Sequence, residues 1–157
     1  IATPAEHVRL RFNLSHTRGL VACALTWQRD VGVDVENLER QEGSLDVARR
    51  FFAPSEVEAL GRVAEEHRRR RFFDYWTLKE SYIKARGMGL SLPLGQFAFD
   101  VADEEAITIS FGPEIDDDPQ HWEFHASRPT PEHRLALAVR RLPGERLQID
   151  IRETTPL

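Results

Sequence analysis

The segment 69–86 constrains the fold most, because it is the longest stretch in which apolar residues recur with helical spacing. At about 100° per residue, Phe72, Trp76 and Ile83 fall on one line along a helix. Gly87 follows the last turn and is a typical helix end. The sequence therefore predicts a long helix with a buried aromatic face. Its opposite, solvated face is expected to carry Asp74, Thr77, Ser81 and Lys84.

Two charged residues, Lys79 and Glu80, fall inside the apolar arc of this predicted helix. On the helical wheel, Glu80 lies between Phe73 and Trp76. An unpaired charge in an apolar setting is costly and shifts its pKa, so Glu80 needs a partner. The simplest partner is Lys84, one turn later on the same helix. A separate cation, a metal or a ligand is the alternative.

Segments with strand spacing come before and after the predicted helices in the sequence. This order is typical of an α+β fold with a mostly antiparallel sheet and packed helices. The link 28–30 suits a tight reversal, which predicts that 20–27 and 31–36 pair as a hairpin. The other strands are expected at 12–14, 97–101, 106–111, 121–127, 134–142 and 147–152.

A second helix is expected to begin near Glu56, after a shorter helix at 45–52. Ser55 and Glu58 have the spacing of a capping box at its start. Glu56 in the first turn is favourable there on electrostatic grounds alone. The acidic triplet 116–118 is interpreted as a solvated turn rather than a metal site.

The composition is that of an ordinary globular domain, with 157 residues of which 41% are hydrophobic and 30% charged. The net charge of −5 argues against a broad nucleic-acid surface, so the arginines at 68–71 are interpreted as a solvated helix face. No apolar run is long enough to span a membrane, and no signal peptide is recognised, so a cytoplasmic location is expected. Cys23, the single cysteine, excludes an internal disulfide and is expected in the core, within the buried strand 20–27.

The strand VGVDVE at 31–36 places two carboxylates, Asp34 and Glu36, on the same face. Carboxylates two residues apart repel each other unless a positive charge lies between them. Mg²⁺ favours such oxygens, and it typically takes one or two carboxylates together with substrate phosphates. If the long helix packs against this strand, Glu80 joins the pair. The alternative is an exposed strand end with ordinary acidic residues.

Basic and hydroxyl side chains near these acids would suit a phosphate. Lys79 and Lys84 are placed to neutralise phosphate charge if Glu80 faces the strand. Ser15 and His16 could donate hydrogen bonds to a phosphate or diphosphate, although a Ser-His pair at a strand end is more often a turn. Together these residues predict a phosphate-and-magnesium site.

Four motifs in order resemble the 4′-phosphopantetheinyl transferases, and in particular the larger, Sfp-type members. They are FNLSH at 12–16, VGVDVE at 31–36, FFAPSE at 51–56 and WTLKESYIKARGMGLSLP at 76–93. The resemblance covers 12 to about 139. It implies an enzyme that moves the phosphopantetheine arm of coenzyme A to a serine of an acyl or peptidyl carrier protein, with Mg²⁺, releasing adenosine 3′,5′-bisphosphate.

The resemblance also implies roles for individual residues. Asp34, Glu36 and Glu80 would hold Mg²⁺. Glu56 matches a glutamate proposed as the base for the carrier serine, and its alternative role is the favourable charge at a helix start. Lys84 would steady the diphosphate.

The remaining implied contacts are with the coenzyme. Lys79 would lie beside Lys84 at the diphosphate, and Ser15 and His16 would contact the 3′-phosphate. Glu56, Glu80 and Lys84 are thus the expected catalytic residues.

Sfp-type enzymes consist of two similar halves, with the active site between them. In this chain, residues 1–18 correspond to the end of the first half and 19–157 to the second half. We expect that the chain lacks most of the first half, or that its exposed cleft face self-associates. The competing functions are a non-catalytic module that docks an acidic carrier protein, an inactive fragment, or another Mg²⁺-dependent phosphoryl-transfer enzyme.

Overall fold

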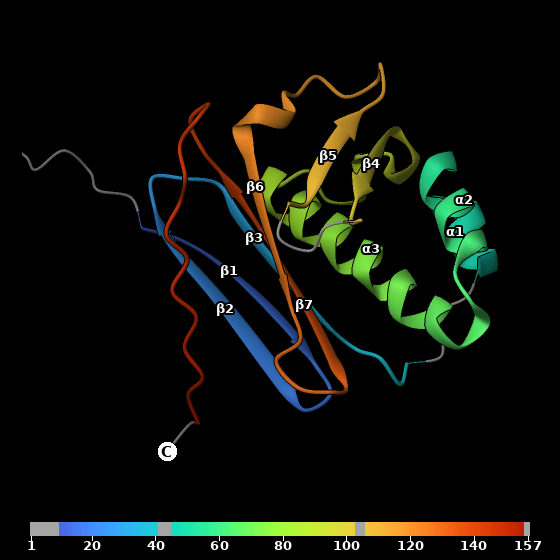
Figure 1. Ribbon diagram of the computed structural model, residues 1–157. Helices are drawn as coiled ribbons and strands as arrows, with labels where there is room; N and C mark the ends of the chain where they lie inside the picture. The colour runs from blue at the N-terminus through green and yellow to red at the C-terminus, as the bar shows by residue number, and fades with distance from the viewer. Residues whose placement is uncertain (1–9, 41–44, 103–105, 156–157) are drawn as a thin grey trace, which may run out of the picture.

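The computed structural model describes residues 10–40, 45–102 and 106–155. A sheet of the strands β3 (Val31–Asn37), β7 (His133–Arg140) and β6 (Trp122–Ser127) forms the centre, in that order, with antiparallel neighbours. The long helix α3 (Glu65–Arg86) lies across one face of this sheet (Figure 1). The predicted α+β class with a mostly antiparallel sheet is therefore confirmed.

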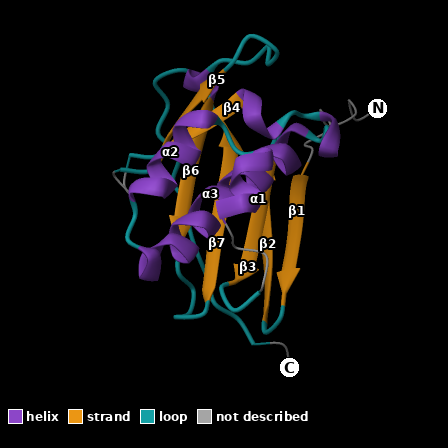
Figure 2. Cartoon of the chain, turned by 90° about the vertical axis from the view of Figure 1, so that its right-hand side faces the viewer, coloured by secondary structure: helices purple, strands orange, loops and turns teal. Residues whose placement is uncertain are grey.

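Shorter elements complete the helical side of the molecule, which faces the viewer in Figure 2. Helices α1 and α2 pack on the far side of α3 from the sheet, and a small antiparallel hairpin of β4 and β5 covers its middle. Among the described residues, three single turns of 3₁₀ helix link these parts. The bounds are α1 Leu45–Phe51, α2 Pro54–Arg62, η1 Gly89–Ser91, η2 Leu94–Gln96, β4 Phe97–Asp100, β5 Thr108–Phe111 and η3 Pro119–His121.

The predicted hairpin of 20–27 with 31–36 is wrong. Strand β2 (Leu20–Trp27) pairs instead with β1 (Leu10–Thr17), and β3 pairs with β7. The β1–β2 turn contains Gly19, whose φ of +85° is readily adopted only by glycine. The short strand predicted at 12–14 is the centre of β1. The strand predicted at 147–152 does not form among the described residues.

The β1–β2 hairpin is here called the ribbon. Its outer face is apolar and exposed. Its inner face carries small residues, Ala22 and Ala24, which pack on Val33 and Val35 of the sheet. The expectation that 20–27 is a buried strand with Cys23 in the core is therefore wrong, because Cys23 points outward. The large exposed side chains of this face are Leu10, Phe12, Leu14, Val21, Leu25 and Trp27.

Helix α3 is buried on two sides, so its predicted solvated face is also wrong. Asp74, Thr77 and Ser81 are buried against the sheet. Gly32 in β3 permits this close approach, because a Cβ there would lie 2.0 Å from the carbonyl oxygen of Ser81. The buried polar groups find partners: Thr77 donates to Phe73 O at 2.8 Å, and Asp74 pairs with Arg134 at 2.7 Å.

The helix ends agree only partly with the predicted caps. Gly87 ends α3 with a φ of +63°, as predicted. At the start of α2, the expected capping box of Ser55 and Glu58 does not form. The carboxylate of Glu56 instead accepts from the backbone N–H of Ala53, since the helix starts earlier, at Pro54.

The acidic loop 116–118 is anchored to α3 rather than fully solvated. Asp117 accepts from the hydroxyl of Tyr82 at 2.7 Å and from the indole of Trp122 at 2.9 Å, and it also pairs with Arg86. Burial, followed by the hydrogen bond to Asp117, raises the pKa of the Tyr82 hydroxyl. Asp117 therefore fixes the C-terminal end of α3. Within the described residues, no helix combines the length and apolar composition needed to cross a membrane.

Candidate functional site

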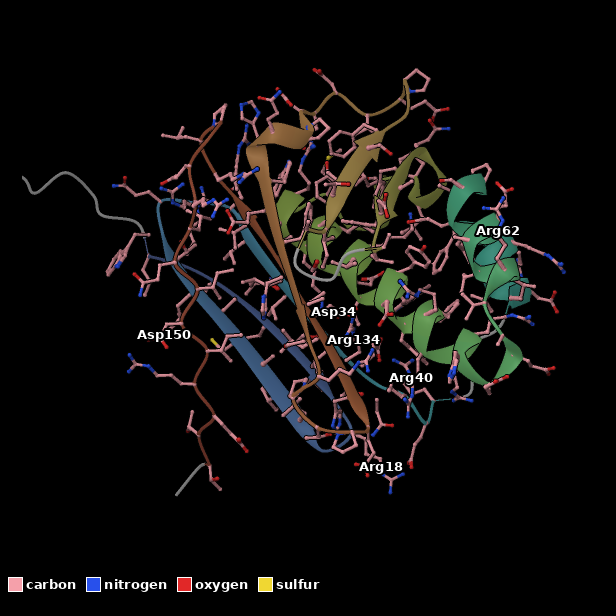
Figure 3. The ribbon with its side chains drawn as sticks, in the orientation of Figure 1. Arg18, Asp34, Arg40, Arg62, Arg134 and Asp150 are labelled. Carbon is pink, nitrogen blue, oxygen red and sulfur yellow. The ribbon has the colours of Figure 1, made fainter. Side chains whose placement is uncertain are left out.

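The candidate site lies where β1, β3 and α3 meet, with Asp34 at its centre. Asp34 is buried between the sheet and α3 (Figure 3). Its Oδ1 accepts from the Lys84 ammonium at 2.7 Å and from the Ser15 hydroxyl at 3.0 Å. Its Oδ2 is buried and has no hydrogen-bond partner in the described part of the chain. Ser15 and Lys84 therefore hold the first of these oxygens in place.

The hydroxyl of Ser15 connects the ribbon to this carboxylate. It donates to Asp34, and it accepts from the backbone N–H of Val35 at 3.2 Å and from Lys84 at 3.1 Å. Lys84 also donates to the carbonyl of Val33 at 3.2 Å. These bonds use the donor and both acceptor positions of the hydroxyl. Ser15 therefore orients Asp34 and Lys84 relative to β3.

Two further side chains of β1 accept hydrogen bonds from backbone amides of β3, one on each side of the bond from Val35 N–H to Ser15. Asn13 accepts from Val33 N at 2.9 Å, and Thr17 accepts from Asn37 N at 3.2 Å. Alternate side chains of β1 thus satisfy the edge amides of β3 in place of a backbone ladder. This alternation explains why Ser15 points into the site.

Glu36 is the second buried carboxylate of β3. Its Oε2 accepts from Arg40 at 2.7 Å, and both Arg40 and Trp76 of α3 favour its charged form, against burial, which raises its pKa. Sequence reasoning missed both partners. Arg40 follows the strand in a turn, where no periodicity applies. Trp76 lies one helical turn before Glu80, and this spacing was the available signal.

Glu80 is half-buried and faces the same region. Burial raises its pKa above the ordinary value, and the negative charge of Asp34 raises it further, while Lys84 acts in the opposite direction. Burial also raises the pKa values of Asp34 and Glu36. These three carboxylates therefore influence one another electrostatically, although Lys84 and Arg40 lie among them.

The donor set suits a hard divalent cation. Carboxylate oxygens are the ligands that Mg²⁺ prefers, and the partnerless Oδ2 of Asp34 is an available one. As the side chains stand, however, no group of three or more acidic, histidine or cysteine residues within the described ranges is arranged to hold a metal ion. Magnesium binding by Asp34, Glu36 and Glu80 therefore stays a prediction.

Three predicted site residues lie elsewhere. His16 follows Ser15 on the strand and is exposed on the outer side of the ribbon. Lys79 and Glu56 are buried against each other, with their charged groups 2.8 Å apart. The structure thus gathers Ser15, Asp34, Glu36, Glu80 and Lys84, and it does not bring His16, Lys79 or Glu56 to them.

A cleft of about 310 Å³ opens next to Lys84, between β1 and the end of α3. Arg11 and Arg140 both approach Asp30 at its rim, at 3.3 and 3.5 Å. The cleft carries more positive than negative side chains, which favours an anionic ligand. Its lining comprises Arg11, Phe12, Asn13, Asp30, Val31, Lys84, Ala85, Arg86, Gly87 and Arg140.

The fold has a counterpart among solved structures. The holo-[acyl-carrier-protein] synthase (AcpS) of Thermotoga maritima superposes with a TM-score of 0.54 at 24% identity, covering 71% of this chain and 62% of that chain. This similarity concerns the fold alone. It places the antiparallel sheet and its crossing helix in a known architecture.

The chain belongs to the 4′-phosphopantetheinyl transferase superfamily, whose sequence profile matches residues 30–139. The 4′-phosphopantetheinyl transferase HetI of Nostoc sp. is 43% identical over 52% of this chain and 35% of its own length. The 4′-phosphopantetheinyl transferase Sfp of Bacillus subtilis is 36% identical over 62% of this chain and 42% of its own. A phosphopantetheinyl transferase of Thraustochytrium sp. is 32% identical over 82% of this chain and 48% of its own length. The chain spans less than half the length of these relatives.

Proposed function

We propose that the protein transfers the 4′-phosphopantetheine arm of coenzyme A to a serine hydroxyl of an acyl or peptidyl carrier protein. The serine oxygen bonds to the phosphorus next to the pantetheine, and the bond from that phosphorus to the leaving phosphate breaks. Adenosine 3′,5′-bisphosphate departs, and the serine proton passes to a base. Membership of the superfamily supports this reaction, and the arrangement of Ser15, Asp34 and Lys84 is the observation that carries it.

The charges of the site suit this chemistry. Asp34, Glu36 and Glu80 would hold Mg²⁺, which offsets the diphosphate charge when bound. Lys84 reaches the same place from α3, and its ammonium would donate to the diphosphate. Ser15 bonds to Lys84 and would keep it in register with Asp34 while the ammonium turns from Asp34 to the diphosphate.

The coenzyme would approach along the basic cleft beside Lys84. His16 is exposed and is proposed to contact the 3′-phosphate from the ribbon, as the family resemblance implies. The hydroxyl of Ser15 is already occupied, so its contact with the same phosphate requires that the present bonds rearrange. A cytoplasmic location is proposed together with this substrate.

The outer face of the ribbon supports a proposal about assembly. Its large apolar side chains, among them Phe12 and Trp27, are more than half exposed. Contiguous apolar surface of this kind marks a protein interface. We propose that a further half-domain or a second copy covers it. The proposed boundary between the first and second halves, between residues 18 and 19, falls in the β1–β2 turn. Both strands of the ribbon would therefore lie at this interface.

The reaction is tested by mass spectrometry of an apo carrier protein incubated with coenzyme A and Mg²⁺. The chain is assayed as it stands and again with any preceding coding sequence attached. We expect the carrier to gain the mass of phosphopantetheine, and the variant D34N to remove that gain. Carrier binding without any mass gain in either form would instead support the non-catalytic docking module. Nucleotide turnover without a carrier would support another phosphoryl-transfer enzyme.

A further inference from the structure

Two oppositely charged side chains are enclosed on the side of α3 that faces α1 and α2. Glu56 and Lys79 lie 2.8 Å apart, and both side chains are 0% exposed. Taking two charges out of water is costly unless each is fully paired and hydrogen-bonded. Neither group has a surface that a coenzyme or a carrier serine could contact. Their role must therefore be exerted through the protein.

The hydrogen bonds of Lys79 are complete. Besides Glu56, its ammonium donates to the carbonyl oxygens of Leu94 at 2.8 Å and Phe97 at 2.6 Å. It also lies 4.3 Å from the centre of the Phe97 ring, within range of a cation–π interaction. An ammonium has three donors, and these contacts use all of them. Lys79 therefore ties α3 to η2 and to the start of β4.

Glu56 completes the connection from the other side. Its carboxylate accepts from the backbone N–H of Ala53 at 2.9 Å and of Phe99 at 2.9 Å, in addition to Lys79. These bonds link the start of α2 to β4. The pair thus joins α2, α3, η2 and β4 at a single buried point.

This point is next to the candidate site in sequence, because Lys79 precedes Glu80. Adjacent residues on a helix point about 100° apart, so fixing one direction fixes the other. Gly32 holds the opposite side of α3 by its close contact with Ser81. Helix α3 is therefore clamped between the buried pair and the sheet, and both contacts oppose rotation about its axis.

We propose, on the basis of the function proposed above, that Glu56 is a positioning residue that acts through Lys79. The pair sets the rotation of α3 and hence the direction of Glu80 toward Asp34, and it touches neither coenzyme nor carrier. The base role that the family resemblance implies for Glu56 needs its carboxylate at the carrier serine. These two roles predict opposite results for one double variant.

The test compares E56Q, K79M and E56Q/K79M with the parent. Each single variant leaves one buried charge without its partner, so we expect a lower unfolding temperature and at least a tenfold loss of kcat. The double variant removes both charges while keeping similar volumes. It should recover most of the unfolding temperature and most of kcat, with a residual loss because two carbonyls lose the Lys79 donor.

A second readout is independent of transfer. Mn²⁺ affinity, measured by electron paramagnetic resonance, should weaken in both single variants and return in E56Q/K79M, since Glu80 regains its direction. E80Q is the matched control: it should weaken Mn²⁺ binding without lowering the unfolding temperature. If the single variants do not fold, the double variant still decides between the two roles.

The inference is overturned if E56Q/K79M folds as stably as expected but has no more transfer than E56Q. That result would identify the Glu56 carboxylate as a participant in the chemistry. It is also overturned if the single variants bind Mn²⁺ as tightly as the parent. If the parent transfers nothing, either as it stands or with any preceding coding sequence attached, the proposed function fails, while the Mn²⁺ and unfolding measurements still test the positioning role.

Discussion

Replacing Gly32 with alanine should separate α3 from the sheet and disable the site. The added Cβ would lie 2.0 Å from the carbonyl oxygen of Ser81 and 2.5 Å from the backbone nitrogen of Ala85. To reach ordinary contact at 3.4 Å, the Ser81 oxygen must move by about 1.4 Å. Because both obstacles are backbone atoms of a helix, no side chain can swing aside to relieve the clash.

The cost follows from that displacement. Overpacking a well-packed interior costs about 1–3 kcal/mol, and a clash with rigid backbone belongs at the upper end. We therefore expect G32A to lose about 3 kcal/mol of unfolding free energy. The same shift would stretch the 2.7 Å contact between Lys84 and Asp34, so transfer should fall with stability.

Urea denaturation followed by fluorescence measures the first effect, and the carrier mass assay measures the second. The matched control is G61A, because Gly61 lies in α2 with nothing within 4 Å of its added Cβ. Alanine is the better helix former there, so G61A should gain about 0.5–1 kcal/mol. A stability of G32A within about 0.5 kcal/mol of the parent, the range of neutral surface changes, would refute the packing argument.

Three further substitutions test other parts of the site. S15A should cost about 1–3 kcal/mol of unfolding free energy and reduce transfer. T17A, which loses a similar bond to a strand amide, should leave transfer intact. Equal transfer by the two variants would show that Ser15 is not part of the site. E80Q should abolish most transfer at saturating Mg²⁺ while retaining the fold. Because the pKa of Glu80 is raised, its ionisation opposes folding at neutral pH. E80Q should therefore be more stable than the parent at pH 7 in denaturation experiments without metal. This gain should vanish as the pH falls below about 4.5, the ordinary pKa of glutamate. A stability difference between E80Q and the parent that stays the same at all pH values would contradict the pKa shift. L25K should shift the sedimentation of the chain toward monomer, and unchanged sedimentation would argue against the ribbon face as an interface.

Local patterns were sufficient to place several residues of the candidate site. The period of two in VGVDVE placed Asp34 and Glu36 on one side of β3, and the helical period of 69–86 located α3 and the inward direction of Glu80. Ser15 and Lys84 were also named as candidates, although the helical wheel placed Lys84 on the solvated face, and the structure brings both to Asp34. The directions of Asp34, Glu36 and Glu80 were predictable because side-chain direction depends on backbone geometry within a few residues.

Other features depend on partners that are distant in the sequence. Strand β3 pairs with β7, about a hundred residues later, and backbone hydrogen bonds do not differ between one strand and another. The apolar outer face of β2 appeared to be the buried one, yet small alanines on the other face pack on the sheet. Size and hydrophobicity alone did not indicate which face another layer would cover.

The directions of the two neighbouring charges on α3 illustrate this division most clearly. The sequence alone determined that Lys79 and Glu80 lie in an apolar arc and need partners. Only the tertiary structure decided that Lys79 turns to Glu56 while Glu80 turns to the carboxylates of β3. The physical reason is that α3 is enclosed on two sides, so two adjacent residues that point about 100° apart enter different buried environments.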